Sequence, residues 1–276
     1  MTDLDFDPLA VPVSPAATVM LLDDRPSLHV LMLRRTSRVV FGPDNWVFPG
    51  GRVDPDDHQE AFDAICAGLS DAEASRILEV TRGGLAWWVA ACRETLEEAG
   101  LLMAAGASTG TGLDLTALRD RVRANETAFI DLLLEHGVTL DVTAIEEVAR
   151  FITPVGSPRR FDARFFVART PHGQVAHFDD GEIVNLAWLE PAEALERWQA
   201  GEMTMMSPTR RMLSCLARYR SVDEVMAAAR RRQPMHRVGV TEVDGEYRMV
   251  LPGERGYERA EMETEKGWLR LWELPG

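Results

Sequence analysis

Residues 93–101 read Arg-Glu-Thr-Leu-Glu-Glu-Ala-Gly-Leu, and this stretch decides how the chain folds. Helix-favouring residues precede it from Leu85 onward, and glycine is a common residue just past the end of a helix. We therefore expect a helix over residues 85–99 that Gly100 terminates.

The acidic residues of this predicted helix suit a metal ion. Glu94, Glu97 and Glu98 are three and four positions apart, which places their carboxylates on one helix face. Such crowding is unfavourable without a cation, and hard oxygen donors suit Mg²⁺ or Mn²⁺. The alternative is a solvated surface helix on which Arg93 pairs locally with Glu97.

A glycine-containing loop upstream supports the metal interpretation. Residues 46–51 read Trp-Val-Phe-Pro-Gly-Gly, in which the proline ends strand pairing and the glycines permit backbone shapes that other residues resist. Together with Asp57, this strand-to-loop element would bring backbone carbonyls to the same cation.

The two segments together resemble the box of the Nudix hydrolase family. Its pattern is Gly, five residues, Glu, seven residues, Arg-Glu, aliphatic, any, Glu-Glu, any, Gly, aliphatic. Residues 93–101 match the second half except for a threonine at the aliphatic position, and Gly51 opens the first half. Asp57 stands where the family has glutamate, and 35 residues separate it from Arg93. The box is therefore split by an insertion.

A split box resembles the coenzyme A diphosphatase-like branch of the family, to which the peroxisomal enzyme of animals belongs. Further segments similar to that branch are residues 33–36, 153–162 and 251–253, so the resemblance covers most of the chain. It implies an α/β fold, an α/β/α sandwich with a mixed central sheet, and it implies pyrophosphohydrolase activity.

The resemblance also implies a role for each residue of the box. Glu97 and Glu98 would be the principal Mg²⁺ or Mn²⁺ ligands, Glu94 a ligand or the base for water, and the Gly50 carbonyl a further ligand. Arg93 would pair with Asp57 and fix the loop against the helix, since a guanidinium binds a carboxylate through two hydrogen bonds.

Residues outside the box are expected to complete the site. Among several acids we choose Glu182 as an additional metal ligand over Asp179, Asp180, Glu146 and Glu147, although each could equally be a solvated acid. Forked hydrogen bonds from arginine would bind substrate phosphates. The candidate substrate-binding residues are Arg34, Arg35, Arg159, Arg160 and Phe161; the alternative for Phe161 is a place in the core.

We interpret residues 1–276 as a single Nudix domain with a helical insertion at about 58–84 and a C-terminal helical and hairpin extension at about 203–276. Apolar runs predict strands over 16–22, 28–34, 148–153, 161–168 and 183–189. Helical spacing is found over 59–80, 115–135, 191–198, 207–219 and 221–232, and a hairpin is expected over 238–251.

The composition of the chain limits the classes of molecule that we expect it to bind. A net charge of −14 repels polyanions and anionic lipid surfaces, so we expect neither nucleic acid nor membrane as a partner. Three widely spaced cysteines and an acidic N-terminus without an apolar run indicate a cytoplasmic protein with reduced thiols. The expected partner is a small nucleoside-diphosphate derivative, and a homodimer is compatible with the sequence.

The expected reaction is metal-dependent hydrolysis of a pyrophosphate linkage. The branch resemblance favours coenzyme A or acyl-coenzyme A as substrate, with ADP-ribose, NADH or nucleoside triphosphates as alternatives, because loops around the box select the attached groups. A nucleotide sensor without catalysis is the alternative from another class. Retention of all three glutamates favours the enzyme.

Overall fold

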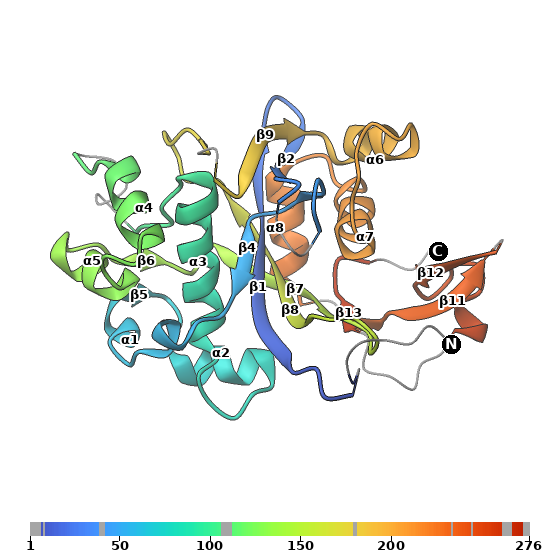
Figure 1. Ribbon diagram of the computed structural model, residues 1–276, viewed down its shortest axis with the longest axis horizontal. Helices are drawn as coiled ribbons and strands as arrows, with labels where there is room; N and C mark the ends of the chain where they lie inside the picture. Colours follow the sequence, from blue (N-terminus) through green and yellow to red (C-terminus); the bar gives the residue numbers. More distant parts are fainter. Residues whose placement is uncertain are drawn as a thin grey trace.

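A mixed sheet with helices on both faces forms the centre of the molecule (Figure 1). The computed structural model describes residues 7, 9–38, 42–105, 112–178, 181–232, 234–243, 245–260 and 267–272. The strand order is β10-β13-β7-β8-β1-β2-β3, with β4 beside β1 and β9 beside β2. The strands are β1 (Val13–Asp24), β2 (Leu28–Arg35), β3 (Trp46–Val47), β4 (Gly50–Arg52), β7 (Ile145–Ile152), β8 (Arg160–Arg169), β9 (Ile183–Leu189), β10 (His236–Arg237) and β13 (Gly267–Leu269).

Strand β1 organises this sheet because it changes partner along its length. It runs parallel to β8 from Val13 to Leu22, whereas its other pairings are antiparallel. Residues 16–18 pair with β4 and residues 22–24 pair with β2. The presence of one parallel pairing among antiparallel ones confirms the predicted mixed sheet.

Alternating side chains of β1 enter two separate cores. Val19 and Leu21 face a core covered by helix α3 (Leu85–Ala99), whereas Met20 and Leu22 face a second core. Helices α7 (Ser207–Leu216) and α8 (Val222–Arg230) cover that second core. Helix, sheet and helix therefore form three layers, which confirms the α/β/α sandwich.

The segment expected to be a helical insertion is only partly helical. It contains the single turn α1 (Phe62–Ile65) and the helix α2 (Asp71–Leu78), but the short strand β5 (Cys66–Ala67) lies between them. β5 pairs in parallel with β6 (Leu140–Asp141), because burial of this stretch against a distant segment overrides its helix propensity.

Helix α2 of the insertion is fastened to the start of α3. Asp71, the first residue of α2, accepts hydrogen bonds from the backbone N–H groups of Gly83 and Leu85, each at 3.0 Å. The Ser75 hydroxyl accepts a further bond from Gly84 N–H at 2.9 Å. These bonds satisfy N–H groups that lack a partner within a helix, so the insertion also caps α3.

The helical prediction for residues 115–135 is corrected to two helices, α4 (Leu115–Arg123) and α5 (Phe129–Glu135). Asn125 lies between them with a φ of 53°, a left-handed conformation that cannot continue an α-helix. This break exposes backbone and side chains of residues 123–129 to the cavity described below.

The C-terminal region follows its prediction closely. It contains α6 (Pro191–Gln199), α7, α8, the hairpin β11 (Gly239–Val243) and β12 (Glu246–Val250), and the short helix η3 (Tyr257–Arg259). Asp244, which lies between the two strands of this hairpin in the sequence, is outside the described residues. In the part of the chain that the structure describes, no helix is long and apolar enough to cross a membrane.

Candidate active site

Helix α3 ends where the sequence predicts, and its end is closely packed. Gly100 has a φ of 65°, and its N–H donates to Leu96 O at 3.0 Å. A Cβ at Gly100 would come within 2.2 Å of the His177 ring. Glycine is therefore needed both for the left-handed cap and for the approach of the loop before β9.

Thr95 occupies the position at which the Nudix pattern has an aliphatic residue. Its side chain is fully buried, and its hydroxyl donates to Ala91 O one turn earlier at 2.7 Å. Because the polar atom is satisfied within the helix, the methyl group can pack in the core at little cost.

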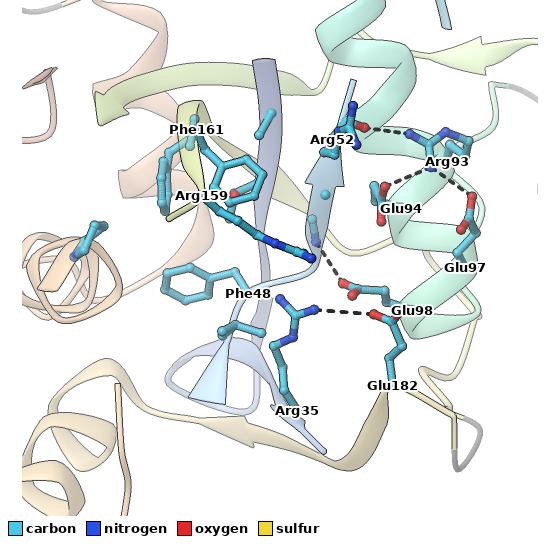
Figure 2. A pocket seen from close by; sticks show the side chains of 18 of the residues that line it. Arg35, Phe48, Arg52, Arg93, Glu94, Glu97, Glu98, Arg159, Phe161 and Glu182 are labelled. Atoms are coloured by element: carbon cyan, nitrogen blue, oxygen red, sulfur yellow. Dashed lines mark hydrogen bonds and ion pairs between the residues drawn. The ribbon is translucent and has the colours of Figure 1, made fainter. Parts of the chain in front are cut away.

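The three glutamates of α3 line one large cavity of about 1290 Å³ (Figure 2). Glu98 accepts a hydrogen bond from Gly50 N–H at 2.9 Å, which joins the helix to β4. A Cβ at Gly51 would lie 2.3 Å from a Glu94 oxygen, so a larger residue there would displace the Glu94 carboxylate. The glycine-containing loop and the acidic helix face therefore meet, as the sequence predicts.

Arg93 connects the two halves of the split box. Its Nε and Nη2 donate to the two oxygens of Asp57, both at 3.0 Å, and Nη2 also donates to Arg52 O at 2.9 Å. Asp57 lies in the short helix η1 (Pro55–His58), and its side chain is 2% exposed. The expected bidentate contact between Arg93 and Asp57 is therefore present. Arg93 also donates a hydrogen bond to Glu97 at 3.0 Å, which is the local pairing expected for the alternative of a surface helix.

Burial and mutual repulsion raise the pKa values of the glutamates. Burial raises the pKa of Glu94 well above its ordinary value, and Glu98 and Glu97 raise it further against the lowering effect of Arg93. Burial also raises the pKa of Glu98 to about 7, although the Gly50 N–H and the Arg35 charge lower it. Desolvated carboxylates that repel one another are stabilised by a cation, so this donor set fits Mg²⁺ or Mn²⁺.

The glutamates are engaged in hydrogen bonds in this structure. Arg93 Nη1 donates to Glu94 at 2.8 Å and to Glu97 at 3.0 Å, while Glu98 is bonded to Gly50. Among the described residues, no three acidic, histidine or cysteine side chains are gathered closely enough to hold a metal ion as they stand. Coordination by all three glutamates therefore requires side-chain rotation toward a common point.

Glu182 lines the same cavity, just before β9. Its carboxylate lies 3.4 Å from Arg35 Nη2, and its charge contributes to the raised pKa of Glu98. The competing acids Glu146 and Glu147 lie on β7 outside the cavity, paired with Arg230 and Arg164. The other two, Asp179 and Asp180, lie outside the described residues.

The structure separates the candidate arginines into two groups. Arg35 and Arg159 line the cavity together with Phe161, whereas Arg34 and Arg160 do not. A register irregularity between Arg34 and Arg35 breaks the alternation at the end of β2, and Arg34 instead pairs with Asp44 at 3.2 Å.

Arg160 points away from the cavity because it precedes Phe161 on β8, where successive side chains face opposite sides of the sheet. Its guanidinium donates to Thr153 O at 3.1 Å. Figure 2 shows Arg159 extending past Phe161 and Phe48 toward Glu98. Two of the four predicted phosphate-binding arginines are therefore placed to reach a ligand in this cavity.

Sequence reasoning missed the cavity walls that come from distant segments. Residues 122–129 between α4 and α5 form one end, and residues 205–210 with Met249 form the other. Three of these residues, Arg123, Arg210 and Met249, carry no motif. Only their placement by the fold identifies them, so no pattern in the sequence could have found them.

The fold and the acidic helix face together define a Nudix hydrolase. The chain belongs to the family of the NUDT19 Nudix domain, whose model matches residues 72–215. A crystal structure of a NUDIX hydrolase from Alicyclobacillus acidocaldarius, 25% identical, matches with a TM-score of 0.66 over 79% of this chain and 97% of that one.

Two similar proteins are both called acyl-coenzyme A diphosphatase NUDT19. That of Gallus gallus is 27% identical over 83% of this chain and 72% of its own length. That of Homo sapiens is 28% identical over 71% of this chain, which spans 62% of the human protein. The predicted family and enzyme class are confirmed, and this class acts on small-molecule substrates.

Proposed function

We propose that this protein hydrolyses the diphosphate linkage of coenzyme A or acyl-coenzyme A, giving adenosine 3′,5′-bisphosphate and phosphopantetheine or its acyl derivative. The observation that carries the proposal is the cavity of about 1290 Å³, which the α3 glutamates line together with residues from distant segments. Ligand sites commonly measure about 300–1,000 Å³, so this cavity has room for large groups on both sides of a diphosphate. The names of the chicken and human relatives point to the same substrate class.

The metal ligands that we propose are Glu97 and Glu98, supplemented by the Gly50 carbonyl and Glu182, with Glu94 as a further ligand or as the base for water. A bound Mg²⁺ or Mn²⁺ supplies positive charge that neutralises the diphosphate and favours ionisation of the attacking water. Burial and the neighbouring glutamates raise the pKa of Glu94, which makes it a better proton acceptor than a solvated carboxylate.

Three arginines are assigned roles around this centre. Arg93 holds the loop of Asp57 against α3 and so fixes the position of the glutamates beside it. Arg35 and Arg159 reach the cavity from separate elements, and forked guanidinium groups bind phosphate oxygens well. Attack of water on phosphorus then breaks the anhydride bond without a covalent enzyme intermediate.

The test is turnover by the purified protein and by Glu97→Gln on coenzyme A, ADP-ribose, NADH and nucleoside triphosphates. Each reaction contains Mg²⁺ or Mn²⁺, and mass spectrometry identifies the products. We expect metal-dependent release of phosphopantetheine from coenzyme A, lost in the variant. Preference for another diphosphate would refute the substrate and keep the reaction class. Nucleotide binding without turnover of any substrate would refute the enzyme.

A further inference from the structure

One end of the cavity contains an apolar lobe, built on the sheet face opposite α3, and Ser207, Thr209 and Arg210 line the cavity near it. Strand alternation on β8 turns Phe161 and Phe165 into the cavity, while Asp162 and Arg164 between them face the other side. Phe151 on β7 packs edge-on against Phe165 with ring centroids 5.2 Å apart. Three phenylalanines from adjacent strands therefore form the floor of this lobe.

Methionines from the C-terminal region close the lobe. Met205 and Met206 precede α7, and Met249 lies on β12. All three line the cavity, and Met205 and Met249 pack in the same hydrophobic cluster as Phe151 and Phe165. Met249 lies beyond residues 72–215, which the family model matches, so part of this wall comes from outside the matched region.

The chemistry of the lobe differs from that of the opposite end of the cavity. Unbranched thioether side chains adapt to flexible apolar groups of varied length. A nucleobase would lose hydrogen bonds to water in such surroundings, which is costly unless polar partners replace them. The other end, between α4 and α5, presents Arg123, Asn125 and Thr127 to the cavity, and these polar groups can replace hydrogen bonds to water.

Resting on the proposed function, we propose that the lobe of Phe151, Phe161, Phe165, Met205, Met206 and Met249 binds the acyl chain of an acyl-coenzyme A thioester. The C-terminal extension then determines selectivity among acyl groups, while α3 supplies the hydrolysis. The adenosine end of the substrate lies toward the loop between α4 and α5.

The experiment compares kcat/KM for coenzyme A, acetyl-coenzyme A and hexanoyl-coenzyme A with Mg²⁺. Burial of each added methylene is expected to raise kcat/KM about two- to fourfold, so the four extra methylenes raise hexanoyl- over acetyl-coenzyme A by about 15- to 250-fold. Met249→Gln keeps the length of the side chain and adds a polar end. It is expected to lower the hexanoyl-to-acetyl ratio about fivefold or more.

Met235→Gln is the matched control, since Met235 belongs to the same C-terminal region but lines a different cavity. It should leave the ratio unchanged. Met206→Gln repeats the test from the second wall segment should Met249→Gln fail to fold. Hydrolysis of coenzyme A without chain-length dependence, or with an equal loss on all three substrates in both lobe variants, overturns the lobe assignment and leaves the proposed function standing. Absence of hydrolysis of every coenzyme A compound overturns both.

Discussion

The two walls of the cavity are built in different ways. The α3 wall is polar and local: Arg93, Glu94, Glu97 and Glu98 come from two turns of one helix, and Arg93 donates hydrogen bonds to Glu94 and Glu97. The apolar lobe takes side chains from β7, β8, the segment before α7 and β12, which lie up to about 100 residues apart along the chain.

This difference explains why one Nudix centre serves many substrates. The local wall can be kept intact by a short motif, whereas the assembled wall changes whenever a distant loop or strand changes. We therefore expect substitutions in α3 to remove chemistry or stability, and substitutions elsewhere around the cavity to alter affinity and selectivity.

The largest effect is expected from the centre of the α3 wall. Glu97→Gln keeps the size of the side chain but removes a charge that we assign to the metal. Loss of about 4 kcal/mol of transition-state stabilisation corresponds to about a 10³-fold drop in kcat. Steady-state kinetics at saturating Mg²⁺ measure this drop. Glu146→Gln, on β7 outside the cavity, is the matched control and should retain activity.

Within the same wall, substitution of Arg93 is expected to cause a large loss in the free energy of unfolding. Arg93→Met leaves the carboxylate of Asp57 buried without its partner, which costs about 3–5 kcal/mol. Urea unfolding of the metal-free protein measures this change. Arg34→Met removes an exposed pair with Asp44 and is expected to cost less than about 1 kcal/mol. Equal losses in the two variants would contradict the structural role of Arg93.

A smaller effect on affinity separates two neighbouring arginines. Arg159→Gln removes a cation that reaches the cavity, and loss of a charge-assisted hydrogen bond lowers kcat/KM about 10- to 100-fold. Arg160→Gln, one residue later and facing away, should change it less than about twofold. Equal losses of activity in the two variants would contradict the assignment of Arg159, and not Arg160, to substrate binding.

The smallest effect concerns pH. The pKa of Glu98 is about 7 in the folded protein against an ordinary value of 4.5, so the folded state binds more protons between these two pH values. The contribution of Glu98 to the stability of the metal-free protein therefore falls as the pH rises from 4.5 to 7 and is level above that window. Urea unfolding in EDTA at several pH values should show a weaker fall for Glu98→Gln. Identical slopes would contradict the assignment.

The sequence predicted the elements whose signals are local. The glutamate spacing and Gly100 each define structure within a few residues, and the structure has both. It did not predict the strand β5 or the break at Asn125, because tertiary contacts and a single left-handed residue decide them.

The candidate site divides in the same way. The meeting of the Gly50 loop with α3 followed from the box pattern, but the exclusion of Arg34 and Arg160 depends on strand register. A change of register by one residue reverses which side chains enter a cavity, and the neighbouring residues in the sequence do not indicate the register. The methionine wall is likewise visible only after folding.

The fastening of the insertion by Asp71 has a consequence for the order of folding. Asp57 and Arg93 are 36 residues apart, which is about two doublings of their separation in an uninterrupted box. The longer loop raises the entropic free-energy cost of bringing the two residues together by roughly 1.2 kcal/mol. Asp71 bonds to residues only 12 and 14 positions away. These short-range contacts can form first and shorten the effective loop, so we expect the ion pair across the box to be a late contact on the folding pathway.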